Sequence, residues 1–136
     1  MYSYDCNKRI RYGETDQMGY LYYGHYPFLY EIGRVEAIRS LGITYKYLEE
    51  NLGIIMPVLY VESKYLLPVY YDEMIVIRTT LSEMPTKMIC FHHEIFNESN
   101  QLVNRGLVKL FFILKEQKKR ISAPDYLTTK LLPFFD

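Results

Sequence analysis

The chain has 136 residues, of which 49% are hydrophobic and 24% are charged, and its formal net charge at pH 7 is zero. These values are ordinary for a soluble globular protein with one hydrophobic core, so we expect a single domain over residues 1–136. A neutral chain lacks the basic surface typical of nucleic-acid binding, which argues against a nucleic acid or a membrane surface as the main partner.

Aromatic and cysteine content indicate the setting of the protein. The chain has 15 tyrosines, 7 phenylalanines and no tryptophan, a bias typical of pockets and subunit interfaces. Cys6 and Cys90 are the only cysteines and lack metal-ligand spacing, which indicates free thiols in a reducing compartment. The first ten residues contain no signal-peptide core, and no apolar run approaches the roughly 20 residues of a membrane span. We therefore expect a cytoplasmic protein.

A strand, a loop and a long helix are the first predicted elements. Residues 6–12 alternate loosely in polarity, as a strand does, and Gly13 ends that strand. The loop over residues 14–22 follows. Pro27 fits only the first turn of a helix and Gly42 is a natural stop, so a helix of about four turns lies between them.

The long helix is predicted to have one apolar and one polar side. The apolar side recurs at helical spacing and comprises Phe28, Leu29, Ile32, Val35, Ile38 and Leu41. The polar side comprises Glu31, Arg34, Glu36 and Arg39.

The second half of the chain is predicted to be mainly strands. Thr44 is a suitable N-cap for a short helix over residues 45–51. The expected strands then span residues 54–67, 73–81, 88–96 and 102–114, joined by segments short enough for hairpins. The last strand is nearly all apolar, so we expect it to lie centrally and to be covered on both faces. Residues 124–132 are predicted to form a terminal helix.

These elements predict an α+β fold in which one long helix packs on a five-stranded antiparallel sheet. One helix covers one face of such a sheet. The other face would remain exposed and rather apolar, so we expect a second subunit.

The element order and the first loop resemble a known family. The β-α-β-β-β-β order resembles the hotdog fold. The sequence YGETDQMG over residues 12–19, followed by YYGHY over residues 22–26 and by Glu31 and Arg34, resembles the acyl-CoA thioesterases of the 4-hydroxybenzoyl-CoA thioesterase type. The resemblance extends over nearly the whole chain, with further matches at Lys64, Tyr65 and Pro68 and at residues 71–73.

The resemblance implies an enzyme that hydrolyses the thioester of an acyl- or aryl-CoA without a metal or cofactor. It implies a homodimer or homotetramer with each site at a subunit interface. The acid of the loop is the catalytic carboxylate in that family, and here it is Asp16. The helix-start N–H that polarises the thioester carbonyl would belong to Tyr23, with Gly24 beside it. His25 stands where many relatives have asparagine, so the motif assigns no role to its imidazole.

The residues themselves are compatible with this chemistry. Asp16 can act as a general base or as a nucleophile, and N–H groups at a helix start can stabilise an oxyanion. Gly19 would let the loop pass close to the substrate. Tyr22 and Tyr26, with Tyr20 and Tyr30, would line an acyl or aryl tunnel or else serve core and dimer packing. Glu31 would help to position Asp16 or a water, or else pair with Arg34.

The residues also allow other functions. The same fold could bind acyl-CoA or an acyl carrier without hydrolysing it, and a hydratase ranks last because its histidine pattern is missing. His92 and His93 are neighbours on a strand and face opposite ways, so no metal site is expected there. A basic set is more simply a solvated strand end than a phosphate site; it comprises Arg105, Lys109, Lys115, Lys118, Lys119 and Arg120.

Overall fold

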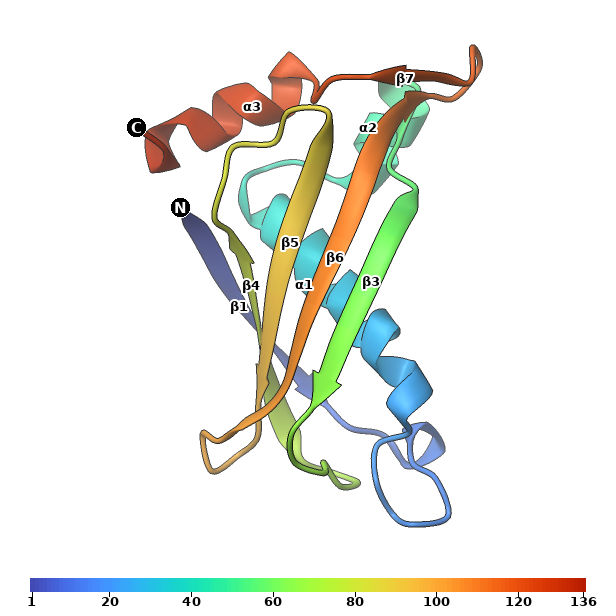
Figure 1. The fold of residues 1–136 in the computed structure, drawn as a ribbon, viewed down its shortest axis with the longest axis vertical. Helices are drawn as coiled ribbons and strands as arrows, with labels where there is room; N and C mark the ends of the chain where they lie inside the picture. Colours follow the sequence, from blue (N-terminus) through green and yellow to red (C-terminus); the bar gives the residue numbers. More distant parts are fainter.

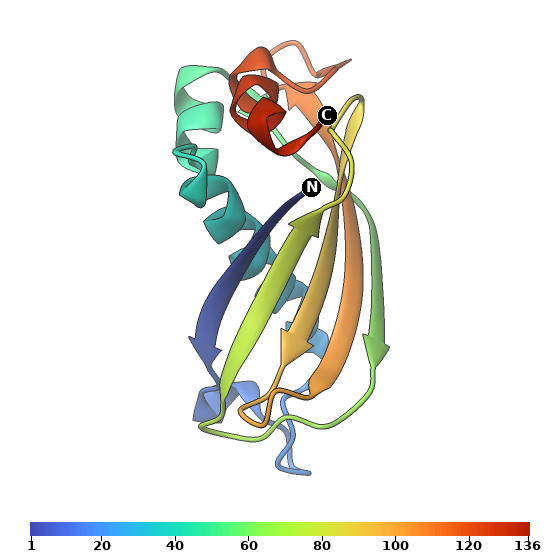
Figure 2. The same cartoon turned by 90° about the vertical axis from the view of Figure 1, so that its left-hand side faces the viewer.

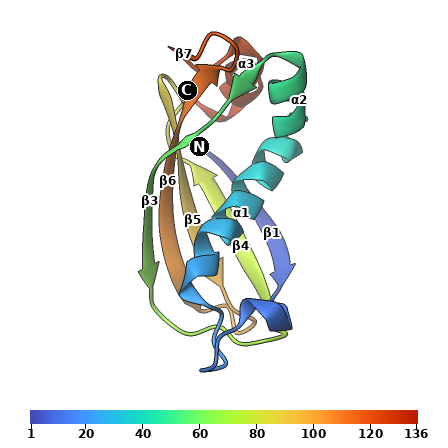
Figure 3. The ribbon, with the colours of Figure 1, turned by 90° about the vertical axis from the view of Figure 1, so that its right-hand side faces the viewer.

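The computed structural model describes residues 1–136 and has two layers. The long helix α1 (Tyr26–Ser40) crosses the concave face of a curled antiparallel sheet (Figures 1 and 3). The C-terminal helix α3 (Asp125–Leu131) lies at one end of the sheet, beside the start of the chain (Figure 2). There the N-terminal ammonium donates a hydrogen bond to the carbonyl of Phe134. The predicted arrangement of one long helix on a sheet is confirmed.

Five long strands and two short ones make up the sheet. The long strands lie in the order β1-β4-β5-β6-β3 and are β1 (Tyr2–Arg9), β3 (Val58–Tyr65), β4 (Met74–Leu81), β5 (Met88–Phe96) and β6 (Leu102–Leu114). The short strands β2 (Ile54–Ile55) and β7 (Lys119–Ile121) pair with the end of β6. The remaining helices are η1 (Tyr12–Glu14), η2 (Tyr23–His25), α2 (Tyr45–Asn51) and η3 (Leu132–Phe134).

The limits of two predicted strands were wrong. β1 begins at Tyr2 and ends at Arg9, because it pairs along the whole of β4, and residues 12–14 form the turn η1 instead. The predicted strand over residues 54–67 is broken between β2 and β3 at Met56 and Pro57, since proline has no N–H for the ladder. The short helix capped by Thr44 is confirmed, with the Thr44 hydroxyl accepting the Tyr47 N–H at 3.0 Å.

Residues 68–72 do not form a hairpin. β3 pairs with β6, whereas β4 pairs with β1 and β5, so the segment crosses the ends of two other strands (Figure 1). The other two short links do join neighbouring strands. β6 is an interior strand. Its helix-facing side is buried in the chain, whereas Leu107, Lys109 and Phe111 are half-buried, so the expected cover of both faces stays a prediction.

The buried face of α1 matches the predicted apolar side only in part. Leu29 and Ile38 are buried as predicted. Phe28 is exposed, whereas Arg34, assigned to the polar side, is buried. The contact face is centred on Gly33, where an added Cβ would lie 2.4 Å from the Thr79 hydroxyl and 2.8 Å from an Ile77 methyl. Glycine has no apolar side chain, so a pattern of apolar residues does not reveal Gly33, although this glycine marks the closest approach of helix and sheet.

Tyr30 fixes the position of α1 on the sheet. Its ring is fully buried and stacks on the His93 imidazole, with centroids 4.8 Å apart and planes 4° apart. The ring lies against Gly106, where a Cβ would approach Tyr30 Cζ to 2.2 Å. The Tyr30 hydroxyl shares a hydrogen bond of 2.7 Å with Ser63 and donates to Asn104, and burial raises its pKa to about 12. The ring and hydroxyl therefore link α1 to three strands.

His93 is a neutral imidazole inside this contact. Its Nδ1 shares a hydrogen bond of 3.1 Å with the Thr79 hydroxyl, and its buried Nε2 has no partner. Burial, followed by the charges of Arg34 and His92, lowers the pKa of His93 to about 3. His92 is exposed on the opposite face of β5, as the strand alternation predicts.

This imidazole makes stability depend on pH. Between about pH 3 and pH 6.5 the unfolded chain binds one more proton at His93 than the folded chain, so the free energy of unfolding falls as the pH falls. From pH 7 to pH 5 the loss should be about 2 kcal/mol. His93→Phe keeps a ring against Tyr30 and should remove that part of the loss in urea unfolding. Equal losses for the wild type and the variant would contradict a neutral buried His93.

Candidate active site

A tight turn presents Asp16. The Asp16 N–H donates to the Tyr20 carbonyl at 2.9 Å, and the Gly19 N–H donates to the Asp16 carbonyl at 2.9 Å. Thr15 and Leu21 form an isolated bridge that closes the turn. Gly19 adopts a φ of +82°, a conformation that favours glycine, so its role here is to permit the turn.

The Asp16 carboxylate is held at one oxygen and open at the other. Oδ1 accepts the backbone N–H groups of Met18 at 2.9 Å and Tyr20 at 3.2 Å. No group in the chain donates to Oδ2. Asp16 is not the N-cap of α1, which is His25, so capping does not occupy the carboxylate. The arrangement orients the side chain and leaves one basic oxygen available.

Glu14 anchors the base of this turn, a role that sequence reasoning missed. Its Oε1 accepts from Lys8 Nζ at 2.8 Å and from the Arg11 N–H at 2.6 Å, while its carbonyl accepts the Tyr22 N–H at 2.9 Å. Burial alone would raise the pKa of Glu14, but the hydrogen bonds from Lys8 and Arg11 outweigh it and hold the pKa below its usual value. An acid three residues after the start of a turn is the signal that could have revealed it.

The helix begins with donors that have no acceptor. The turn η2 runs into α1, and the N–H groups of Tyr23 and Gly24 donate to no backbone carbonyl. A Cβ on Gly24 would lie 2.6 Å from Tyr22 Cε2, so the Tyr22 ring packs over this residue. Unpaired N–H groups at a helix start can stabilise negative charge on a bound oxygen.

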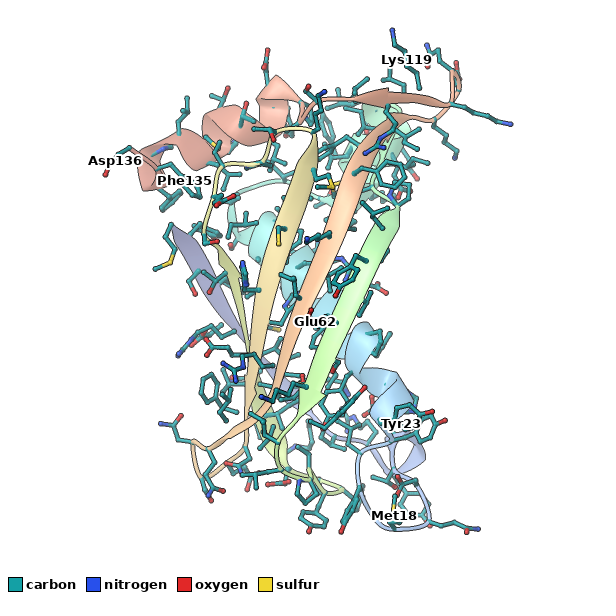
Figure 4. The ribbon with its side chains drawn as sticks, in the orientation of Figure 1. Met18, Tyr23, Glu62, Lys119, Phe135 and Asp136 are labelled. Carbon is teal, nitrogen blue, oxygen red and sulfur yellow. The ribbon has the colours of Figure 1, made fainter.

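Asp16 and Tyr23 line the same hollow. It has a volume of about 280 Å³ and lies at the end of the molecule where Met18 and Tyr23 are seen (Figure 4). Its walls are mainly apolar and aromatic and consist of Asp16, Met18, Tyr20, Leu21, Tyr23, Tyr26, Tyr65, Leu66, Leu67 and Pro68. The structure therefore brings together Asp16, Tyr23 and Tyr26, three of the residues that the sequence singled out.

A second, more polar hollow shares Asp16. It is lined by Tyr12, Gly13, Thr15, Asp16, Gln17, Gly19 and Tyr71. Asp16 thus stands in the wall between an apolar hollow and a polar one, and Gly19 faces the polar one.

Tyr22 and Glu31 are not gathered into either hollow. Tyr22 packs on the ring of Tyr23 at 4.9 Å and on His25 at 5.8 Å. Glu31 is exposed on α1 and forms no ion pair with Arg34, and its predicted role stays a prediction. His25 lines neither hollow.

The basic residue Lys119 lies at the opposite end of the molecule from Met18 and Tyr23 (Figure 4). No helix has the length and apolarity needed to span a membrane.

The chain is similar in sequence and in structure to known thioesterases. The model of the thioesterase-like superfamily matches residues 10–131. The chain is 30% identical over 123 residues to a putative acyl-CoA thioesterase of Bacillus subtilis, YneP, covering 88% of each protein. The crystal structure of a DHNA-CoA thioesterase from Staphylococcus aureus superposes with a TM-score of 0.88 at 29% identity, covering 98% of this chain and 88% of that one.

A more distant structure supports the fold alone. A 4-hydroxybenzoyl-CoA thioesterase in complex with 4-hydroxybenzoyl-CoA superposes with a TM-score of 0.86 at 18% identity, covering 96% of this chain and 99% of that one. The predicted hotdog fold is confirmed.

The Glu14 anchor can be tested without an activity assay. Glu14→Gln removes the charged acceptor of Lys8 and should lower the free energy of unfolding by about 1.5 kcal/mol at pH 7. It should also speed hydrogen exchange at the Tyr22 amide, since the base of the turn loosens. Lys8→Met should give a similar loss, and the double variant little more than either single change. Additive losses, or wild-type exchange at Tyr22, would contradict the anchor.

Proposed function

The chain belongs to the thioesterase-like superfamily, and from that premise we propose that it hydrolyses the thioester of an acyl- or aryl-CoA at Asp16. The family resemblance inferred from the sequence is confirmed, and thioester hydrolysis is the activity named for its relatives. One observation carries the assignment to Asp16: its carboxylate has a free oxygen beside an apolar hollow at a helix start.

Asp16 would serve hydrolysis in one of two ways. As a general base it takes a proton from water, the water oxygen bonds to the thioester carbon, and the carbon–sulfur bond breaks as the proton passes to the thiolate. As a nucleophile its free oxygen bonds to that carbon and expels CoA thiolate, and water then cleaves the mixed anhydride. The free Oδ2 is compatible with both routes.

The start of the helix would supply the oxyanion donors. The N–H groups of Tyr23 and Gly24 have no internal acceptor, so they are available to the carbonyl oxygen of a thioester. Losing one such donor typically costs about 2.7–4 kcal/mol of transition-state stabilisation. The Tyr23 contribution then comes from its backbone, and its exposed ring forms a wall of the hollow.

The two hollows on either side of Asp16 suggest which part of a substrate each of them binds. The apolar hollow suits the acyl or aryl group, because its walls are tyrosine, leucine and methionine side chains. The polar hollow, with Thr15 and Gln17, suits the amide-bearing arm of CoA. The thioester would then lie next to Asp16.

A second copy would pair with the exposed edge of the sheet. β3 is an edge strand with Val58 48% and Val61 41% exposed, an arrangement that invites strand addition. The opposite edge, β1, exposes the polar side chains of Ser3, Asp5 and Asn7. Antiparallel pairing of two β3 strands would place the Asp16 hollow beside the second subunit, since Tyr65 at the end of β3 is one of its walls. We propose a dimer through this edge.

Asp16→Asn tests the assignment. Asparagine keeps an oxygen acceptor for the Met18 and Tyr20 N–H groups, so the turn should persist, but it cannot accept the proton of water. We expect thiol release to fall about 10²–10⁴-fold, the usual scale for a positioned base. The assay should cover short, long and aromatic acyl-CoAs. Wild-type turnover by the variant would contradict the role of Asp16.

The matched control is Asp125→Asn, which changes an exposed aspartate on α3 and should leave turnover unchanged. Tight acyl-CoA binding by the wild type without thiol release from any substrate would instead indicate a binding protein.

Val61→Lys tests the dimer. A lysine at this exposed position of β3 introduces like charges at a two-fold interface and should raise the dimer dissociation constant at least about tenfold, the scale of several unfavourable charge contacts. Asn7→Lys, on the other edge, should have no effect. Sedimentation velocity at several concentrations measures both. Unchanged association of Val61→Lys, or equal weakening by the two variants, would contradict pairing through β3.

A further inference from the structure

Tyr65 closes one side of the apolar hollow. It is the last residue of β3 and pairs with Asn104 of β6. Its ring meets the ring of Tyr26 edge-on, with centroids 5.2 Å apart and planes at 74°, and meets Tyr23 at 6.2 Å and 88°. Three tyrosine rings, from a strand and from the start of the helix, therefore form one continuous wall.

Tyr26 gives this wall a rigid backing. It opens α1, and only 3% of its surface is exposed. Burial, followed by the neighbouring Tyr30, Tyr65 and Glu73, raises the pKa of Tyr26 to about 12. Tyr65, by contrast, is 51% exposed, so its ring, unlike that of Tyr26, can be removed at little cost to the core.

Small side chains follow Tyr65 along the seam between β3 and α1. Because side chains alternate along a strand, Ser63 and Val61 share the helix-facing side of β3 with Tyr65. The Ser63 hydroxyl bonds to Tyr30 at 2.7 Å and to Asn104 Nδ2 at 3.1 Å, and Val61 is half exposed. The side chains of Ser63 and Val61 are both smaller than a tyrosine ring, so neither occupies the volume that such a ring would occupy. Two residues of strand advance about 6.8 Å, so Ser63 and Val61, which do not line the hollow, lie beyond Tyr65 along the strand.

We infer that Tyr65 determines substrate specificity by limiting the length of the acyl group. The inference rests on the proposed function, in which the acyl group occupies the apolar hollow. That hollow, at about 280 Å³, lies just below the roughly 300–1,000 Å³ usual for small-molecule sites. With Tyr65 in place it holds a short chain or a single ring. Without the ring, a longer chain can continue along Ser63 and Val61.

The ring rather than the hydroxyl carries this role. The Tyr65 hydroxyl makes no hydrogen bond within the chain, so the inference predicts that Tyr65→Phe behaves as the wild type. A hydroxyl that recognises a polar substrate group would make Phe and Ala variants alike.

The experiment compares kcat/KM for butanoyl-CoA and dodecanoyl-CoA in the wild type and in Tyr65→Ala. Each newly buried methylene is worth about fourfold, so the dodecanoyl-to-butanoyl ratio should rise more than about tenfold. Tyr65→Phe should stay within about twofold of the wild type, the effect of less than one methylene. Tyr60 lies on the same strand, but it packs against Lys109 on the other face. Tyr60→Ala is therefore the matched control, and its dodecanoyl-to-butanoyl ratio should also stay within about twofold of the wild type. Thermal unfolding confirms that each variant is folded.

Binding measurements separate the two claims. Affinities of butyl-CoA and dodecyl-CoA thioethers, which cannot be hydrolysed, should show the same change of ratio in Tyr65→Ala. A changed binding ratio in a protein that releases no thiol would overturn the proposed function and leave the length limit standing. Thiol release with an unchanged ratio in Tyr65→Ala, or an equal change in Tyr65→Phe, would overturn the length limit and leave the proposed function standing.

Discussion

The position of α1 depends on the stacking of Tyr30 on His93 above Gly106. One buried ring reaches β5 through the imidazole, lies flat on the glycine of β6, and bonds through its hydroxyl to Ser63 of β3. Gly33 brings the same helix against β4. Because these contacts lie within two turns of the helix start, they also determine where the Tyr23 N–H points and how far β3 lies from α1. The walls of the hollow are a consequence of core packing.

The Asp16 side chain is held by different contacts. Asp16 belongs to a short turn that touches the core little, and its direction comes from two backbone N–H groups and from the anchor at Glu14. A rigid helix start and a hydrogen-bonded turn thus meet at one hollow. In the proposed hydrolysis the core would preorganise the oxyanion donors, while the carboxylate would keep one oxygen free for water or substrate.

Much of the fold could be predicted from the sequence, and the features that could not be predicted have identifiable physical causes. Pro27, Gly42 and Thr44 mark helix limits through local chemistry, and the structure agrees with them. The buried face of α1 was predicted only in part: Leu29 and Ile38 are buried as expected, but the face is centred on Gly33, a residue without a hydrophobic signal. The crossing after β3 was missed because a short link allows a hairpin without requiring one, and strand partners are decided by the whole sheet. At the site, the family motif assigns the catalytic carboxylate to Asp16, which stays a prediction, and no local pattern indicates that Tyr65 forms a wall of the hollow.

The central claim is that the thioester binds with its carbonyl at the helix start and its carbon beside Asp16. The most direct measurement is a crystal structure of the Asp16→Asn variant with a bound acyl-CoA. We predict a thioester oxygen about 2.7–3.1 Å from the Tyr23 or Gly24 nitrogen, the distance of an oxyanion contact, with the acyl group in the apolar hollow beside Tyr65. A thioester bound away from these N–H groups, with the hollow empty, would contradict it.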